Sequence, residues 1–298
     1  AAVSLSCRSA LVCPPRPPDL CGAKKIILLM PFHPDNLLLN HHLDRLEAAD
    51  LADHVAHVLC TRGRLDFTFD GRPFALQAGE TMIIVVRNLL EDLRPSADFA
   101  GMCVYVKPDF LERCTPRSNY GIRGSLALYA CPVMQPDAAR FEQLKADFLQ
   151  IERRLMDVGN HFREDLLVCA TQMMFLDYFD IHTSLNGLAH ISLQDNDLMT
   201  RFMQLLERGD YVKHREVGYY ADLLCVTPKY LSEVCKSVSG RTANYWITRF
   251  TTIHLRRLLR EKKMSFTEIT DLFEFSSAAY FSRFVQKHLG MPPSAFRE

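Results

Sequence analysis

The C-terminal part of the chain contains the same short pattern twice. Residues 222–226 (DLLCV) match residues 271–275 (DLFEF) at an offset of 49. After a one-residue insertion, residues 230–234 (YLSEV) match residues 280–284 (YFSRF) at an offset of 50. Each copy predicts a short helix, a tight turn and a second amphipathic helix opened by Thr or Ser, which cap helices by accepting backbone N–H groups. Two such units joined by a basic helix are typical of proteins that read two successive major grooves of DNA.

The repeat also predicts the two hydrophobic cores. We expect the first unit to bury Leu223, Leu224, Val226, Leu231 and Val234, and the second to bury Ile269, Leu272, Phe275, Phe281 and Phe284. Gly240 corresponds to Gly290 at the same offset, and the aromatic residue that follows is Trp246 in one copy and Phe296 in the other. We therefore expect these two aromatic rings to fill equivalent holes.

Length, composition and charge favour an ordinary globular protein with a separate DNA-binding part. A chain of 298 residues suggests about two domains. Hydrophobic residues make up 48% and charged residues 23% of the sequence, which is enough apolar material for large cores. Residues 195–298 contain 16 Lys and Arg against 12 Asp and Glu, a balance of +4, while the whole chain is neutral. The basic C-terminal part suits phosphate contact.

The N-terminal residues are unlike the rest. Cys13 is followed by Pro14-Pro15-Arg16-Pro17-Pro18, which cannot continue a helix, and no signal-peptide order is present. We expect residues 1–40 to form a disordered leader, and the sequence leaves open whether residues 1–25 belong to the natural protein. A metal-binding tail built on Cys7, Cys13 and Cys21 is the alternative.

None of the ten cysteines forms a C-x-x-C pair or a recognisable zinc spacing. We therefore expect reduced thiols in a cytoplasmic protein, with no metal and no cofactor. The longest early apolar run, residues 26–30, is too short to span a bilayer, so no membrane partner is expected.

The N-terminal half predicts strands first and helices later. Residues 64–69 alternate apolar and polar side chains, and Asp70-Gly71 is a favoured two-residue hairpin turn. Further strands are predicted at 73–76, 81–86 and 102–106, an arrangement that suggests a small barrel or sandwich and resembles the cupin-like sensor barrel. The predicted fold class is α+β: a cupin-like β-barrel, two long helices, and then an all-α domain with two helix-turn-helix motifs.

Two amphipathic helices are predicted between residues 137 and 180. They carry more large apolar residues than a small barrel can cover, including Leu166, Met173, Met174 and Phe179. We expect them to form a homodimer interface, and the alternative is that they pack only on their own barrel. The predicted boundaries are 41–181 for the sensor and dimerisation domain, 182–194 for a linker and 195–298 for the DNA-binding domain.

Residues 195–298 also resemble a known family. The matching runs are 220–232 (YADLLCVTPKYLS), 255–259 (LRRLL), 275–284 (FSSAAYFSRF) and 290–297 (GMPPSAFR). They are similar to the DNA-binding domain of the AraC/XylS family of bacterial transcription regulators. The resemblance covers about a third of the chain, and the family commonly places a cupin-like effector and dimerisation domain in front of this unit. Glu274 departs from the family, which usually has Gly in that turn.

The resemblance and side-chain chemistry together predict the DNA contacts. In the first recognition helix, Lys229, Ser232 and Glu233 should face bases, because Lys donates to guanine and Glu accepts from cytosine. An ion pair with Lys229 is the alternative role for Glu233. In the second helix, Ala278, Ala279, Ser282 and Arg283 take the corresponding places. The residues expected at DNA phosphates are Thr227, Lys236, Ser277, Gln286 and Lys287.

The predicted function is a sequence-specific DNA-binding regulator that responds to a small-molecule effector in the N-terminal barrel, and whether it is an activator or a repressor stays open. Its partners would be double-stranded DNA, a second copy of the chain and, for an activator, RNA polymerase. One alternative is a regulator without a small-molecule ligand, because the barrel residues Phe67, Phe69, Phe74 and Ile84 could fill the interior. A cupin enzyme is the remote alternative, since His54 and His57 lack the spacing and the third ligand of a cupin metal site.

Overall fold

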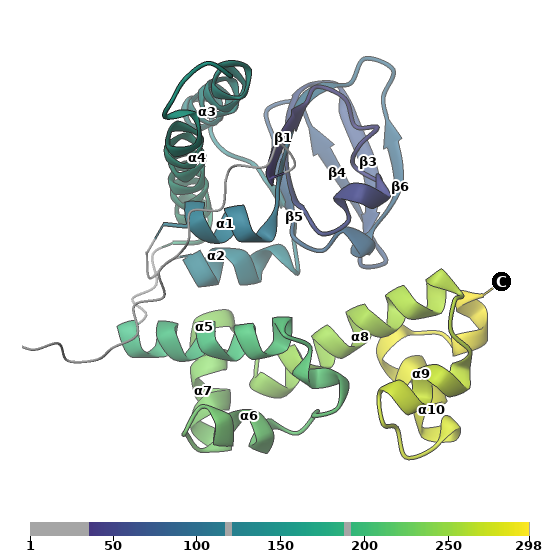
Figure 1. The fold of residues 1–298 in the computed structure, drawn as a ribbon. Helices are drawn as coiled ribbons and strands as arrows, with labels where there is room; N and C mark the ends of the chain where they lie inside the picture. Colours follow the sequence, from purple (N-terminus) through teal and green to yellow (C-terminus); the bar gives the residue numbers. More distant parts are fainter. Residues whose placement is uncertain (1–35, 117–120, 188–191, 298) are drawn as a thin grey trace, which may run out of the picture. The chain divides into compact units, whose positions relative to one another are not determined.

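The computed structural model describes residues 36–116, 121–187 and 192–297. Strands occupy the first part of this range and helices the remainder (Figure 1). Residues 1–35, with the expected leader and its three cysteines, lie outside the described residues. Residues 37–40 form strand β1 (Leu37–Asn40), which pairs with β7 (Ala100–Val106), so the expected leader is too long at its C-terminal end.

The strands form two antiparallel sheets. The five-stranded sheet has the order β1, β7, β2 (Val55–Arg62), β5 (Thr81–Ile84) and β8 (Val133–Met134). The three-stranded sheet has the order β4 (Arg72–Gln77), β3 (Arg64–Phe69) and β6 (Leu90–Pro95). Asp70 and Gly71 join β3 to β4 with φ values of 53° and 73°, which confirms the predicted two-residue turn.

The two sheets share one hydrophobic core. Alternate residues of β2, such as Ala56 and Val58, meet Phe67 and Phe69 of β3 there. The predicted closed cupin-like barrel is not observed, because no strand pairing among the described residues joins one sheet to the other. The chain turns at Gly63, which has φ of 75° and follows the last residue of β2, and β3 then pairs with β4 and β6 rather than with a strand of the first sheet.

Four helices accompany the sheets. Helices α1 (Pro108–Cys114) and α2 (Gly121–Leu128) follow β7, and the long helices α3 (Ala138–Met156) and α4 (Arg163–Asn186) lie side by side (Figure 1). Both long helices were predicted. However, α4 extends to Asn186 and α5 (Leu193–Glu207) begins at Leu193, so both ends of the proposed linker 182–194 are helical.

The apolar residues of α4 are divided between two faces. Met174 is fully buried and Leu166 and Phe179 are half-buried, so these three do not make the exposed surface that the sequence suggested. Met173 and Leu176 are about half exposed, at 53% and 47%, together with Cys169 one turn earlier. The exposed apolar stripe of α4 therefore consists of Cys169, Met173 and Leu176.

A pair of carboxyl groups lies between α3 and α4. Asp147 is buried on α3, and its Oδ2 has no hydrogen-bond partner among the described residues. Burial, followed by a hydrogen bond to Asp177 and repulsion from that carboxylate, raises the pKa of Asp147 to about 8. Asp147 is therefore protonated in the folded protein at neutral pH, whereas it ionises on unfolding.

This raised pKa predicts a pH-dependent stability. The contribution of Asp147 is complete below about pH 4, the ordinary range of the carboxyl pKa, and is lost as the pH rises towards 8. We expect Asp147→Asn to remove this loss. The difference in free energy of unfolding between variant and wild type should therefore rise in favour of the variant by about 2–4 kcal/mol from pH 4 to pH 8. Urea unfolding of both proteins across this range measures it, with the exposed Asp180→Asn as a control. A parallel pH dependence in wild type and Asp147→Asn would contradict the expectation.

Helices make up the C-terminal part of the molecule. After α5 come α6 (Val217–Leu223), α7 (Pro228–Ser239), α8 (Ala243–Glu261), α9 (Phe266–Leu272) and α10 (Ala278–Leu289). Figure 1 shows α8 as the long helix that joins the group around α6 and α7 to the group around α9 and α10. Among the helices described, none has both the length and the apolar character needed to cross a membrane.

Candidate nucleic-acid interface

The first helix-turn-helix unit consists of α6 and α7. Leu224 is the C-cap that follows α6, and Cys225 takes the left-handed conformation, with φ of 56°, where the chain turns. Thr227 then caps α7, because its hydroxyl oxygen accepts the backbone N–H of Tyr230 at 3.2 Å, and Pro228 occupies the first helical position. The predicted turn and cap are therefore both present.

The second unit repeats this geometry in α9 and α10. Glu274 occupies the position equivalent to Cys225 and has the same left-handed conformation, with φ of 49°. Neither turn has a glycine at this position. Because a non-glycine residue in the left-handed region costs about 1–2 kcal/mol, both turns are strained. The Glu274 carboxylate lies 3.4 Å from the amine of Lys213, and Ser277 caps α10 by accepting the N–H of Tyr280 at 3.1 Å.

The residues that we expected to face bases on α7 share its exposed side. The opposite side of α7 is buried through Leu231, Val234, Cys235 and Val238. Lys229 and Glu233 are exposed, and Ser232 is half-buried beside them. The Lys229 amine lies 3.9 Å from the Glu233 carboxylate, so the alternative ion pair is present in the protein without DNA. At these exposures the pair contributes little stability and can separate when DNA binds.

On α10 the exposed side carries fewer hydrogen-bonding groups. Phe281 and Val285 are buried, while the six predicted contact residues are exposed: Ala278, Ala279, Ser282, Arg283, Gln286 and Lys287. The amide of Gln286 donates to the carbonyl oxygen of Gly290 at 3.1 Å. It is therefore already engaged at the end of its own helix in this structure.

The hydroxyl groups of Thr227 and Ser277 stand at the first turns of the two recognition helices. Each accepts a backbone N–H through its oxygen, which leaves the hydroxyl proton free to donate. Free N–H groups and the helix dipole make the start of such a helix favourable for a phosphate. The observed geometry thus suits the phosphate role predicted for both residues.

Helix α8 connects the cores of the two units. Trp246 and Ile247 belong to the core of the first unit, and Leu255 and Leu259 belong to that of the second. The single rigid helix therefore sets the spacing of the two recognition helices. Trp246 fills the first core as expected, and Phe296 packs partly buried against the second.

Two core predictions were wrong in the same way. Leu223 and Leu272 occupy equivalent positions at the ends of α6 and α9 and are 50% and 39% exposed. Tyr220 and Phe273 are fully buried instead. Both first helices are only seven residues long, so their last residue points away from the core at the point where the chain turns. The repeat offset could have shown that the two leucines have the same degree of burial, although not whether they are buried or exposed.

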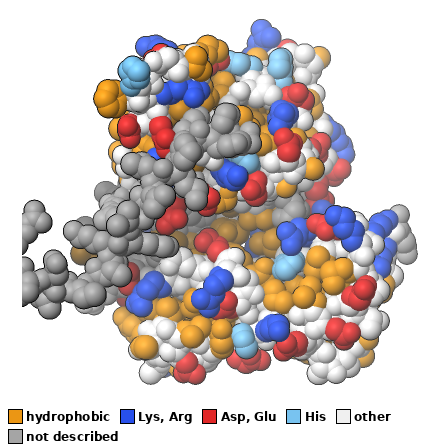
Figure 2. All heavy atoms as spheres, viewed as in Figure 1, with side chains coloured by type: hydrophobic (Ala, Val, Ile, Leu, Met, Phe, Trp, Pro, Cys, Tyr) orange, Lys and Arg blue, Asp and Glu red, His pale blue; other side chains and the backbone are white. Residues whose placement is uncertain are grey.

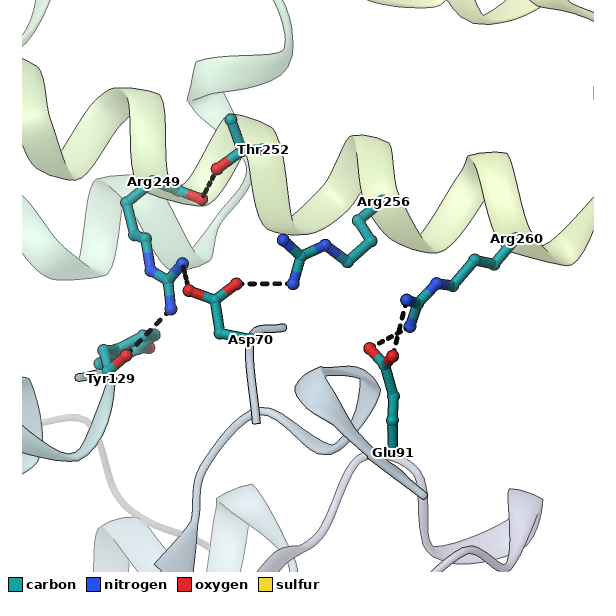
Figure 3. Close-up of polar contacts among 7 residues, drawn as sticks. All are labelled: Asp70, Glu91, Tyr129, Arg249, Thr252, Arg256 and Arg260. Atoms are coloured by element: carbon teal, nitrogen blue, oxygen red, sulfur yellow. Dashed lines mark hydrogen bonds and ion pairs between the residues drawn. The ribbon is translucent and has the colours of Figure 1, made fainter. Parts of the chain in front are cut away.

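Three arginines of α8 are held by acidic residues of the β-rich part (Figure 3). Asp70, at the tip of the β3–β4 hairpin, accepts hydrogen bonds from both Arg249 and Arg256, the second at 2.6 Å. Glu91 forms a two-pronged ion pair with Arg260. Sequence reasoning assigned these arginines only to a basic helix, since nothing in their spacing reveals a partner 169 to 186 residues away. Their guanidinium groups are thus engaged in contacts within the protein in this structure.

On the face seen in Figure 2, charge is mixed rather than separated. Figure 2 shows Lys and Arg side chains interspersed with Asp and Glu over the visible face, without one continuous basic surface. Among the described residues, no three His, Cys, Asp or Glu side chains are grouped so that they could hold a metal ion. The interface is therefore defined by the two recognition helices and their caps.

Comparison with known proteins agrees with this geometry. A family model described as a helix-turn-helix domain matches residues 220–298. The probable transcription factor PqrA of Proteus vulgaris is 27% identical over 103 residues, which cover 35% of this chain and 82% of PqrA. These relatives are regulators of transcription and not enzymes.

The comparison with solved structures gives two weak likenesses. ToxT from Vibrio cholerae, with an unsaturated fatty acid bound, is 15% identical with a TM-score of 0.42, covering 82% of this chain and 86% of ToxT. The AraC-like transcriptional activator CuxR is 15% identical with a TM-score of 0.34, covering 78% of this chain and 79% of CuxR. Because both TM-scores lie below 0.5, the likeness does not extend to a ligand or a mode of action.

Proposed function

We propose, from the premise that residues 220–298 form an AraC-type helix-turn-helix domain, that this protein is a sequence-specific transcription regulator that reads two major-groove segments. The observation that carries the proposal is the pairing of two recognition helices, each with a buried side and an exposed polar side, on one connecting helix. Helices one DNA turn apart, about 34 Å, are suited to successive grooves on one face of the duplex.

The proposed contacts follow the exposed faces. Base edges would be read by Lys229, Ser232 and Glu233 from α7 and by Ala278, Ala279, Ser282 and Arg283 from α10. Phosphates would be bound by Thr227, Lys236, Ser277, Gln286 and Lys287. Adjacent alanines can touch only thymine methyl groups, whereas Lys and Glu offer a donor and acceptors. The first unit therefore sets sequence choice, and the second mainly adds affinity.

A selection of bound fragments from random DNA tests this function. Wild type should select two segments about one DNA turn apart, with a sharp base consensus in the segment read by α7 only. Ala278→Gln should sharpen the second segment, because Gln can pair with adenine. An equally sharp wild-type consensus in both segments would refute the unequal roles, and failure to enrich any sequence would refute the function itself.

Control by a small-molecule effector is the finer part of the proposal. The space between the two sheets does not offer a site, since Phe67, Phe69 and Ile84 are buried there and Phe74 stacks on Phe67 with ring centroids 5.8 Å apart. If this filled core were the only place for a ligand, the protein would be the alternative candidate, a regulator without a small-molecule ligand. An effector would have to bind elsewhere in the N-terminal part.

We further propose that α3 and α4 form a homodimer interface through the exposed apolar stripe Cys169, Met173 and Leu176. Leu149 of α3 is also 43% exposed and adds to the apolar surface of this helix pair. Burying such residues against a second copy removes apolar area from water at about 25 cal/mol per Å². A dimer would bring four recognition helices to two half-sites.

Sedimentation of the full chain at tens of micromolar, an order of magnitude suited to weak interfaces, tests the dimer. Wild type should sediment as a dimer and Met173→Glu as a monomer, because a carboxylate in an apolar interface is costly to desolvate. Leu193→Glu is the matched control, since Leu193 is 71% exposed on α5, away from the stripe. A monomeric wild type, or a Met173→Glu protein that stays dimeric, would contradict the assignment.

A further inference from the structure

A cavity of about 100 Å³ lies on the side of the five-stranded sheet that faces the helices. Its walls include His57 and Ile83 from the sheet, Leu128 from α2, and Phe175, Phe179 and His182 from α4. The residues of β2 alternate, so His57 faces this cavity while Ala56 and Val58 face the core between the sheets. The cavity is therefore separate from the filled interior.

The chemistry of the walls selects an uncharged ligand. Among the described residues, no Lys, Arg, Asp or Glu lines the cavity. Burial lowers the pKa of His57 to about 3, partly offset by the backbone of Val104, and burial together with Arg123 lowers the pKa of His182. Both imidazoles are neutral, so neither offers a counter-charge to a charged ligand that loses its hydration in the cavity.

One wall is aromatic and carries a polar position. The His57 ring stacks on Phe175 at a centroid distance of 5.4 Å and lies 5.5 Å from the ring of Tyr178. The Tyr178 hydroxyl is engaged with Thr81 at 2.8 Å, whereas Nδ1 of His57 is buried without a hydrogen bond of good geometry. A ligand hydroxyl could satisfy this nitrogen in either tautomer, because a hydroxyl both donates and accepts.

Helix α2 connects the cavity to the DNA-binding part. Gly124 and Leu128 lie on the cavity side of α2. Leu126, on the other side, is 4% exposed and belongs to the same hydrophobic core as Leu231 and Val234 of recognition helix α7. An eight-residue helix thus separates the cavity from the helix that reads bases.

The end of α2 is also attached to α8. Tyr129, the residue after α2, accepts a hydrogen bond at its carbonyl oxygen from Arg249 at 2.9 Å (Figure 3). Its ring lies 5.7 Å from both Trp246 and Phe250 of α8. A displacement of α2 would therefore disturb α7 and α8 together.

We propose that this cavity binds a small, uncharged, single-ring aromatic molecule bearing a hydroxyl group, and that α2 transmits its occupancy to α7. The proposal rests on the function proposed above and names the effector site for it. Apolar cavities of roughly 150 Å³ hold benzene, so one ring is the largest group that this space accepts after modest side-chain movement. Two sites are coupled when a ligand favours one position of an element that both contact.

Phenol is the probe, and benzoate, with the same ring and a negative charge, is its matched control. We expect phenol to shift the NMR signals of Met134 and Ile83, which line the cavity, and to change the affinity for the selected DNA about five-fold or more. Benzoate should do neither. Equal effects of phenol and benzoate, or no phenol binding at millimolar concentration, would overturn the proposal.

Two variants test separately whether phenol binds in the cavity and whether α2 transmits this binding to α7. Leu128→Phe should fill the cavity and abolish phenol binding, whereas Met156→Phe at the exposed end of α3 should not. Leu126→Ala should keep phenol binding but reduce the effect of phenol on DNA affinity, measured against its own affinity without phenol. If Leu128→Phe does not fold, Leu126→Ala still tests the proposal. An unchanged effect of phenol on DNA affinity in Leu126→Ala would contradict transmission through α2.

These outcomes distinguish the two proposals. A protein that selects a DNA sequence but ignores phenol retains the proposed function and lacks this effector site. A protein that binds phenol but selects no DNA sequence has the cavity without the proposed function.

Discussion

Lys229→Ala is expected to weaken binding to the selected DNA site by about 1–3 kcal/mol, or about 5- to 150-fold, with little change on random DNA. The Lys229 amine is exposed on α7 and is held only by a 3.9 Å ion pair with Glu233, so it can turn to a guanine at small cost. Titration of labelled selected and random fragments with wild type and variant measures both affinities.

Lys236→Ala is the matched control. Lys236 is exposed two turns further along α7, where a phosphate contact is expected. Its loss should weaken binding to every sequence alike and reduce the slope of log affinity against log salt by about 1. An equal loss on selected and random DNA for Lys229→Ala would place Lys229 among the phosphate contacts.

Asp70→Asn should destabilise the folded chain by about 2 kcal/mol. The side chains of Arg249 and Arg256 are only 12% exposed, and both lose their shared negative partner in this variant. A charge left without its partner in a part-buried place is costly, while Asn tolerates the left-handed conformation of the turn and so preserves the hairpin. Urea unfolding of the full chain gives the free energy.

Asp66→Asn provides the comparison for that experiment. Asp66 also pairs with an arginine, Arg64, but both side chains are about half exposed and both lie on β3. Exposed pairs contribute between about 0 and 1 kcal/mol, so this variant should remain close to wild type. If the two variants lose equal stability, Asp70 does not hold α8 in the way that its hydrogen bonds indicate.

Local patterns predicted the elements of this protein well. The internal repeat identified both recognition helices, and Thr227, Ser277, Gly240 and Gly290 occupy the caps at their ends. Turn chemistry identified the hairpin at Asp70-Gly71. These features succeed because capping and turn formation depend on a few adjacent residues and are largely independent of the rest of the chain.

Patterns were less informative about which side of an element is covered. Leu223 and Leu272 fit the apolar pattern but are exposed, whereas Met174, expected on the surface, is buried. A helical period shows that a helix has an apolar face and does not show where the neighbouring element ends. The expected closed barrel failed for the same reason, since strand pairing depends on partners distant in sequence.

The sequence by itself determined that the C-terminal part carries two helix-turn-helix units and which side chains stand on their exposed faces. Only the tertiary structure decided that Asp70 and Glu91 hold the arginines of α8, and that α2 has the cavity on one side and α7 on the other. The physical reason is the separation in sequence between the residues that interact. Caps, turns and amphipathic faces arise within a few residues, whereas an ion pair or a cavity wall requires side chains that only the folded chain brings together.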